Sequence, residues 1–128
     1  MADLVAGYER RLSDEGDAVE RFLGFPPDTE ERLEAYRAAS PIHSMLPLAT
    51  TTLIVTGTHD VDVPVDLTLA FVDAAASAAA EHNLNSEVRL RFLKVLGADH
   101  YDLLDGSSLY WLTLLPAIEA HIAAILRP

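Results

Sequence analysis

The chain of 128 residues contains no cysteine. Disulfide frameworks, thiolate nucleophiles and cysteine-ligated metal sites are therefore excluded. Basic residues are scarce as well, because nine lysines and arginines stand against 20 aspartates and glutamates, a formal net charge of −11. This excess of negative charge disfavours nucleic-acid backbones and anionic membrane surfaces as partners, and otherwise favours solubility.

The chain also has no apolar run of membrane-spanning length. The alanine-rich segment 70–80 is too short and is interrupted by Asp73 and Ser77. The first residues, M-A-D-L-V-A-G-Y-E-R-R, show no basic start followed by an apolar run, so no signal peptide is visible. We therefore expect a cytoplasmic protein without membrane association. A hydrophobic fraction of 50% with 23% charged residues suits a globular domain.

The first part of the chain has the pattern of short helices. Apolar residues recur every four positions in the segment 4–12, which favours a helix there. The D-x-x-E patterns at 17–20 and 28–31 have the spacing of capping pairs and predict two further helix starts. Gly24 and Pro41 predict where those two helices end.

Two later segments have the pattern of buried strands. Residues 51–56, T-T-L-I-V-T, are largely β-branched and apolar and are bounded by Pro47 and Gly57, which predicts a strand near 53–56. The segment V-R-L-R-F-L-K-V-L begins with apolar and polar residues in alternation, which predicts a second strand near 88–95.

Helical spacing of apolar residues favours one helix between these strands and another after them. The first of these helices is expected to begin near Pro64 and to end at about Asn83. The last is expected to be capped by Ser107 or Ser108, and Pro116 should kink it or split it in two.

The order of these elements predicts the α/β class. A strand–helix–strand unit gives a parallel strand pair with a right-handed crossover helix, here with flanking helices. We expect a single domain of residues 1–128, in which 1–47 form a helical lead-in and 48–128 a strand–helix–strand–helix unit.

Two ionisable residues follow the two expected strands. Asp60 lies three residues beyond Gly57, in the pattern G-x-x-D-x-x-V-P, and His100 ends the pattern G-A-D-H. Parallel strands bring their carboxyl ends to one edge of the sheet, so the two side chains should meet. A carboxylate there can accept the Nδ1–H of the imidazole and stabilise the imidazolium that forms when the base takes a proton. We therefore predict that Asp60 and His100 are catalytic.

The chain resembles the C-terminal part of an α/β-hydrolase. Residues 34–47, E-A-Y-R-A-A-S-P-I-H-S-M-L-P, and 102–111, D-L-L-D-G-S-S-L-Y-W, look like segments of bacterial carboxylesterase-like and prolyl-oligopeptidase-like serine hydrolases. The resemblance covers residues 18–128. It implies a partial α/β-hydrolase fold in which Asp60 is the triad acid and His100 the triad histidine. Thr56 and Gly106 depart from the family, where histidine and proline are common.

The nucleophile of such a hydrolase is absent from the sequence. No G-x-S-x-G occurs, and the upstream oxyanion-hole loop of the family is missing too. The resemblance therefore implies an ester or amide substrate, no cofactor, and a chain that is inactive alone. We expect a fragment that is completed by an upstream half-protein, or one that forms a homo-oligomer.

Two alternatives stay open from the residues alone. One is a non-catalytic α/β interaction module that oligomerises or binds a partner through exposed strand edges. The other is a metal site built from Asp60, Asp62 and His100, although no spacing among them is diagnostic.

The remaining polar and aromatic residues have structural interpretations. We expect turn, loop or capping roles for Ser40, Ser44, Ser107 and Ser108, and we expect Asp102 and Asp105 to cap or brace the loop before the last helix. We expect solvent-facing positions for His43, His59, His82 and His121. The aromatic residues Tyr101, Tyr110 and Trp111 either pack the last helix on the sheet or line a pocket near His100.

Overall fold

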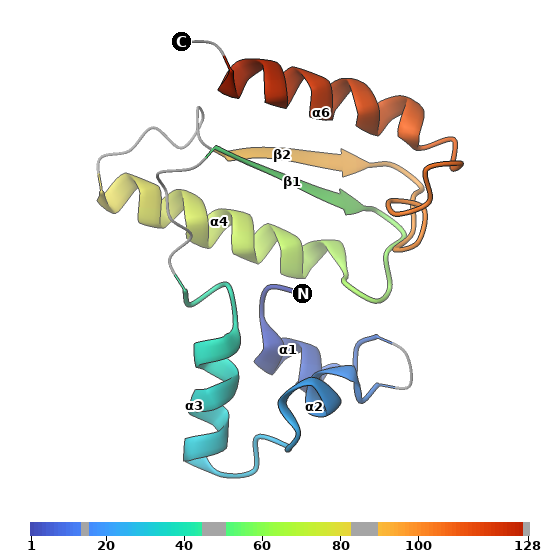
Figure 1. The fold of residues 1–128 in the computed structure, drawn as a ribbon. Helices are drawn as coiled ribbons and strands as arrows, with labels where there is room; N and C mark the ends of the chain where they lie inside the picture. The colour runs from blue at the N-terminus through green and yellow to red at the C-terminus, as the bar shows by residue number, and fades with distance from the viewer. Residues whose placement is uncertain (14–15, 45–50, 83–89, 127–128) are drawn as a thin grey trace.

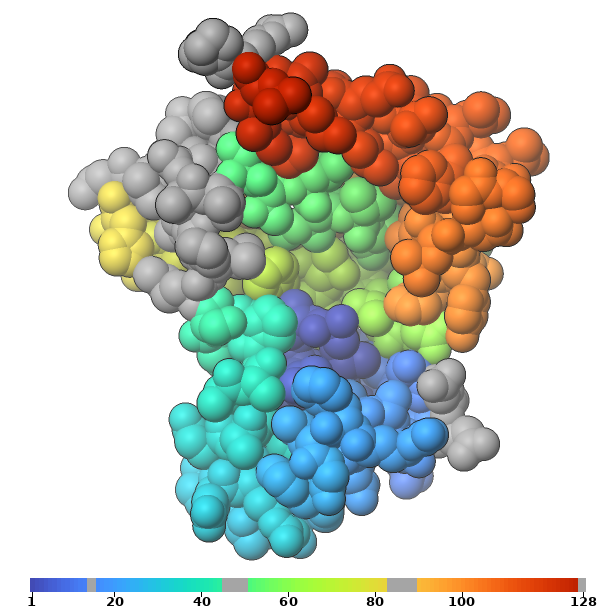
Figure 2. All heavy atoms as spheres, viewed as in Figure 1, coloured from blue at the N-terminus to red at the C-terminus, as the bar shows by residue number. Residues whose placement is uncertain are grey.

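The computed structural model describes residues 1–13, 16–44, 51–82 and 90–126, and these form two lobes (Figures 1 and 2). The first lobe contains three short helices, α1 (Leu4–Glu9), α2 (Ala18–Leu23) and α3 (Glu30–Ala39). The second contains β1 (Thr52–Gly57), α4 (Val65–Glu81), β2 (Leu90–Val95) and α6 (Trp111–Ile125).

The two strands are parallel and are joined by α4. Their register runs from Thr52 opposite Leu90 to Gly57 opposite Val95, so both strands end at the same level. Helix α4 lies against one face of the pair and α6 lies against the other (Figure 1). The predicted α/β class, the parallel pairing and the crossover helix are confirmed. The expected start of the second strand, at 88 and 89, lies outside the described residues.

A small apolar core holds α6 on the sheet. Val95, Ala98 and Leu114 are its buried members, and Trp111 and Ile118 pack against them. Two of the five come from β2 and the loop after it, and three come from α6. The core therefore positions the loop between β2 and α6, which carries His100. Of the two roles predicted for the aromatic residues, Tyr110 and Trp111 have the packing role.

The N-terminal lobe has its own core, which is closed by the hydroxyl of Ser40. Leu4, Val19 and Tyr36 are buried together. The fully buried Ser40 hydroxyl accepts the Leu4 N–H at 2.9 Å and donates to the Tyr36 carbonyl at 2.7 Å. It thereby ties the first turn of α1 to the last turn of α3. The Ile42 N–H then donates to a carbonyl near the start of the chain.

An ion pair links the lobes at the surface. The Arg10 guanidinium donates to the Asp66 carboxylate at 2.6 Å and joins the end of α1 to the start of α4. The hydrogen bond from Arg10 lowers the pKa of Asp66 below its ordinary value. Because both side chains are exposed, this pair adds little to stability and mainly orients the two helices.

Several helix ends differ from the expected ones. Helix α3 is capped by Thr29, whose hydroxyl accepts the Arg32 N–H, whereas Asp28 forms an ion pair with the Arg32 side chain. The Asp28 carboxylate binds the Arg32 guanidinium, so the Thr29 hydroxyl caps the helix in its place. Asp17, expected as a cap, makes no capping bond with its side chain, although Gly24 ends α2 in the left-handed conformation as predicted.

The last helix also differs from expectation. Its capping position is Tyr110, and neither Ser107 nor Ser108 occupies it. Pro116 lies inside a continuous helix and does not split it. Proline removes one backbone donor from the ladder. The turn around Pro116 is exposed, so water can satisfy the carbonyl that loses its partner.

Helix α6 keeps part of its apolar surface in contact with solvent. Its exposed large apolar side chains, with the residue that follows the helix, are Leu112, Leu115, Ile122, Ile125 and Leu126. They lie beside the stripe that packs on the sheet. Among the described residues, no helix has both the length and the apolar character needed to cross a bilayer.

Candidate active site

The loops that follow β1 and β2 are hydrogen-bonded to each other. The Thr58 N–H donates to the Val95 carbonyl at 3.0 Å, and the His59 N–H donates to the Ala98 carbonyl at 2.9 Å. In return, the Gly97 N–H donates to the Thr58 hydroxyl at 2.8 Å. The three bonds extend the pairing of the strands past their ends, so the two loops are held as one unit.

Two glycines make this close approach feasible. A Cβ atom at Gly57 would collide with the carbonyl group of Ala98, which crosses directly over it. Gly97 has a φ of +84°, a left-handed conformation that side chains rarely adopt, and it lies against the Tyr110 hydroxyl. Gly57 is therefore required by the contact between the loops, and Gly97 by its own backbone conformation and by the nearby Tyr110 hydroxyl.

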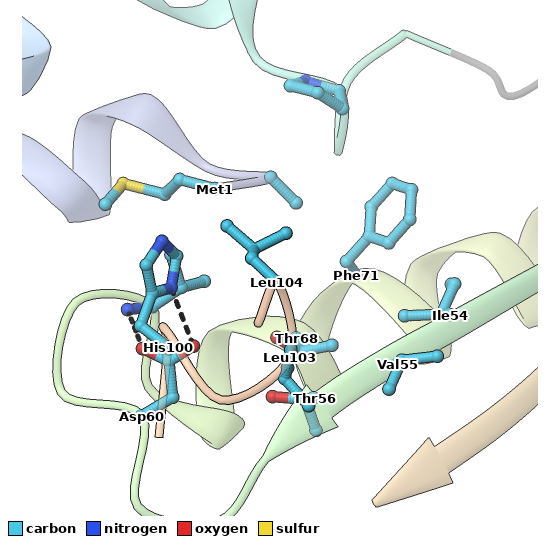
Figure 3. Close-up of a pocket in the computed structure, with 13 residues that line it drawn as sticks. Met1, Ile54, Val55, Thr56, Asp60, Thr68, Phe71, His100, Leu103 and Leu104 are labelled. Carbon is cyan, nitrogen blue, oxygen red and sulfur yellow. Dashed lines mark hydrogen bonds and ion pairs between the residues drawn. The ribbon is translucent and has the colours of Figure 1, made fainter. Parts of the chain in front are cut away.

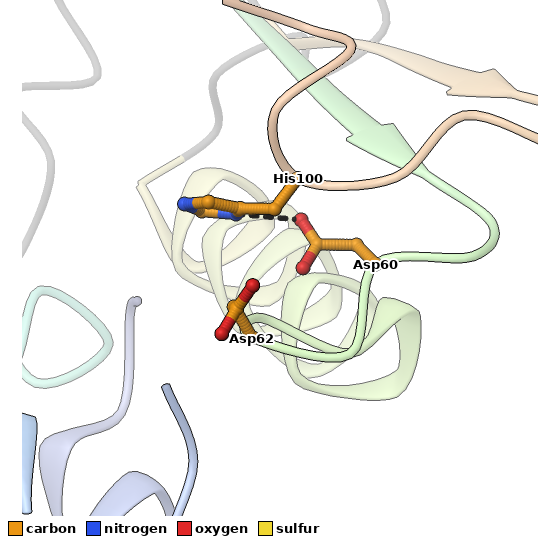
Figure 4. A group of neighbouring side chains, drawn as sticks. All are labelled: Asp60, Asp62 and His100. Atoms are coloured by element: carbon orange, nitrogen blue, oxygen red, sulfur yellow. Dashed lines mark hydrogen bonds and ion pairs between the residues drawn. The ribbon is translucent and has the colours of Figure 1, made fainter. Parts of the chain in front are cut away.

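Asp60 and His100 meet at the top of these loops. His100 Nδ1 lies 2.9 Å from Asp60 Oδ2, as predicted from their places after parallel strands (Figures 3 and 4). The other oxygen, Asp60 Oδ1, accepts the Val63 N–H at 2.7 Å. The Asp60 side chain is 5% exposed and that of His100 is 37% exposed. The Asp60 carboxylate is thus buried with both oxygens hydrogen-bonded, while the imidazole of His100 reaches the surface.

The pairing determines which ring nitrogen is available for chemistry. A carboxylate can only accept hydrogen bonds, so Nδ1 of His100 carries the proton in this contact. The remaining nitrogen, Nε2, points away from Asp60 (Figure 4). A neutral imidazole held in this way presents a lone pair at Nε2 and can act as a general base.

The acidic residues around His100 brace its loop. Asp99 Oδ1 accepts the N–H groups of Tyr101 and Asp102, at 2.8 and 2.9 Å. Asp102 Oδ2 accepts the Asp99 N–H in return. The bracing role expected of Asp102 is confirmed. The Tyr101 ring stands edge-on to the imidazole, with centroids 5.5 Å apart, and is itself exposed.

Asp62 brings a second carboxylate near the pair. One potential ligand atom each of Asp60, Asp62 and His100 lies within 4.8 Å of the other two (Figure 4). However, both oxygens of Asp60 and one nitrogen of His100 already take part in hydrogen bonds. The hydrogen-bonded pair thus explains the position of two of the three groups without a cation, and Asp62 is the group that the pair does not explain.

Two further residues have positions that the sequence did not signal. Ser13 has a φ of +70° and, with His100, lines a smaller hollow of about 230 Å³ between the lobes. No motif surrounds this serine. His121, expected at the surface, is buried on α6, two turns after Leu114 on the side that packs on the sheet, and its Nδ1 has no partner in the described part of the chain. His43, His59 and His82 are exposed as expected.

No protein-family model, curated protein or solved structure matches the chain. The features that bear on function are therefore the two motifs and the geometry of Asp60 and His100.

Replacement of Gly57 by alanine should destabilise the protein. The added Cβ has to displace the Ala98 carbonyl and the loop that carries His100, at a cost of about 1–3 kcal/mol in the free energy of unfolding. Urea denaturation measures the effect. Gly106→Ala is the matched control, because a Cβ at Gly106 meets no atom within 4 Å, and it should change stability by less than about 0.5 kcal/mol. Equal effects of the two substitutions would contradict this account of the loops.

The protonation of the His100 ring offers a direct test of the pairing. At a pH where the imidazole is neutral, ¹⁵N NMR should show His100 with its proton on Nδ1 and a bare Nε2. Asp60→Ala should abolish this preference, because the acceptor is lost. Asp62→Ala should preserve it. The pairing is refuted if the Asp62 variant changes the spectrum as much as the Asp60 variant does.

Proposed function

We propose that this chain supplies the acid and the histidine of a serine hydrolase that cleaves esters or amides. The observation that supports the proposal is the contact of 2.9 Å between His100 Nδ1 and a buried Asp60 carboxylate, which leaves Nε2 on the side of the ring away from Asp60. The order of acid and histidine along the chain agrees with the nucleophile–acid–histidine order of α/β-hydrolases. The parallel strand pair, with helices on both faces, agrees with a partial fold of that kind.

In the proposed reaction, His100 moves the proton and Asp60 orients His100. His100 Nε2 takes the proton of a serine hydroxyl as its oxygen attacks the carbonyl carbon of the substrate. Asp60 stabilises the imidazolium that results. His100 then gives the proton to the leaving alcohol or amine, and a water molecule, deprotonated by the same nitrogen, releases the acid and frees the serine.

The serine itself is proposed to come from a segment outside these 128 residues. The chain has no G-x-S-x-G motif, and a nucleophile needs both a nearby base and hydrogen-bond donors for the oxyanion. An upstream half-protein is the source that the resemblance suggests. Among the described residues, Ser13 is the serine that shares a hollow with His100, so the labelling experiment below includes it.

A second candidate function is an interaction module without catalysis. The supporting observation is the exposed apolar surface of α6, where Leu112 is 77% exposed and Ile122 is 48% exposed. The helix carries one charged residue, Glu119, and its exposed side is otherwise largely apolar, so a second copy of the chain could cover it.

The isolated chain should not hydrolyse simple esters faster than its His100→Ala variant. Without an oriented serine and an oxyanion hole, most of the transition-state stabilisation is missing, so the two rates should agree within about twofold. A chromogenic acetate ester measures the rate, and a fluorophosphonate probe with peptide mapping reports any reactive serine. Stoichiometric labelling of Ser13 that His100→Ala abolishes would place the nucleophile inside this chain instead.

Self-association through α6 should be visible by analytical ultracentrifugation. Ile122→Glu places a charge in the exposed apolar surface and should weaken a dimer by about tenfold or more. Ala120→Glu is the matched control, because Ala120 is exposed on the same helix but away from that surface, and it should have little effect. A wild-type protein that stays monomeric at every concentration excludes the homo-oligomer.

A further inference from the structure

A cavity of about 380 Å³ opens beside the paired side chains, between the two lobes (Figure 3). Its walls come from segments that are far apart in the sequence: the start of the chain, Pro41, strand β1, helix α4, and the loops that carry Asp60 and His100. It is therefore a product of how the lobes pack.

The lining is apolar except at one end. Nine of the 13 lining residues are apolar and two are threonines, so Asp60 and His100 have the ionisable side chains, and Met1 adds its α-amino group. Among the described residues, no lysine or arginine side chain lines the cavity. A carboxylate or phosphate placed there would lose its hydration without gaining a lysine or arginine partner and would lie near the Asp60 carboxylate. The chemistry of the walls therefore selects neutral, apolar ligands.

The polar and apolar ends lie opposite each other. In Figure 3, Asp60 and His100 lie at one end, Phe71 and Ile54 lie at the other, and Leu104 lies between them. A ligand that fills the cavity would thus place one end beside the imidazole and its apolar body against β1 and α4.

We infer that this cavity binds the apolar arm of a neutral carbonyl compound, with the carbonyl group directed toward His100. The inference deepens the proposed hydrolase function, on which it rests, by naming the substrate class: uncharged esters or amides with a compact apolar acyl group. A cavity of about 150 Å³ is known to hold benzene, so 380 Å³ suits about a dozen heavy atoms.

A matched pair of small molecules tests the selectivity. The neutral ketone 4-phenylbutan-2-one and the anion 3-phenylpropanoate have equal numbers of heavy atoms and the same phenylethyl arm. NMR titration of the wild-type protein should give a dissociation constant for the ketone that is about tenfold lower than for the carboxylate. The largest shifts should fall on the methyl groups of Ile54, Thr68 and Leu104.

Two pairs of variants locate the binding site. Thr68→Phe fills the cavity from α4 and should abolish ketone binding, whereas Ala70→Phe, on the exposed side of the same helix, should not. Leu104→Lys adds a cation at an exposed lining position, where folding tolerates it, and should reverse the preference toward the carboxylate. Leu109→Lys is its control, since Leu109 is equally exposed but does not line the cavity.

The outcomes separate this inference from the proposed reaction. Ketone binding is measured on the isolated chain and needs no nucleophile, so it tests the cavity without testing hydrolysis. If the ketone binds but the chain hydrolyses no ester even when a nucleophile-bearing partner completes it, the binding cavity is supported and the proposed hydrolase function is overturned. The proposed ligand site would be overturned by equal affinity for the two probes. It would also be overturned if the ketone shifted residues of α6 and neither Thr68→Phe nor Leu104→Lys altered those shifts. Either result would leave the pairing of Asp60 with His100 unaffected.

Discussion

The contact between the loops after β1 and β2 is the constraint on which the candidate site depends. Thr58 and His59 donate to carbonyls of the second loop, and Gly97 donates back to the Thr58 hydroxyl. These bonds continue the strand register beyond the sheet, so the orientation of Asp60 relative to His100 follows from the pairing of β1 with β2. The distance between an acid and a base is thus set by backbone hydrogen bonds, which are stiffer than side-chain contacts.

The site has a clear division between rigid and adaptable parts. Asp60 is buried and uses both carboxylate oxygens, which restricts it to one rotamer. His100 is partly exposed, and the N-terminal lobe forms part of the wall of the cavity beside it. An exposed ion pair between Arg10 and Asp66 connects that lobe to α4. Orientation of the imidazole therefore depends on the α/β lobe, whereas the shape of the cavity depends on how the two lobes pack.

Much of the α/β lobe could be predicted because its signals are local. The apolar runs that form β1 and β2, the glycines before Asp60 and His100, and the turn residues beyond them all lie within a few positions of what they determine. The predictions that were wrong concern positions where neighbouring residues compete or where distant segments meet. Asp28 and Thr29 compete for one cap, and a neighbouring arginine decides the outcome. The burial of His121 depends on which side of α6 faces the sheet, and the cavity arises from segments that meet only in the folded chain.

The separation of 40 residues between Asp60 and His100 has a consequence for folding. Strands β1 and β2 have to pair in parallel before the two side chains can touch. Closing a loop of this length is entropically unfavourable, and parallel pairing of this kind forms late compared with helices. The hydrogen bond between His100 and Asp60 is therefore a reporter of the completed strand pair, and its spectroscopic signature would count only the molecules in which that pair has formed.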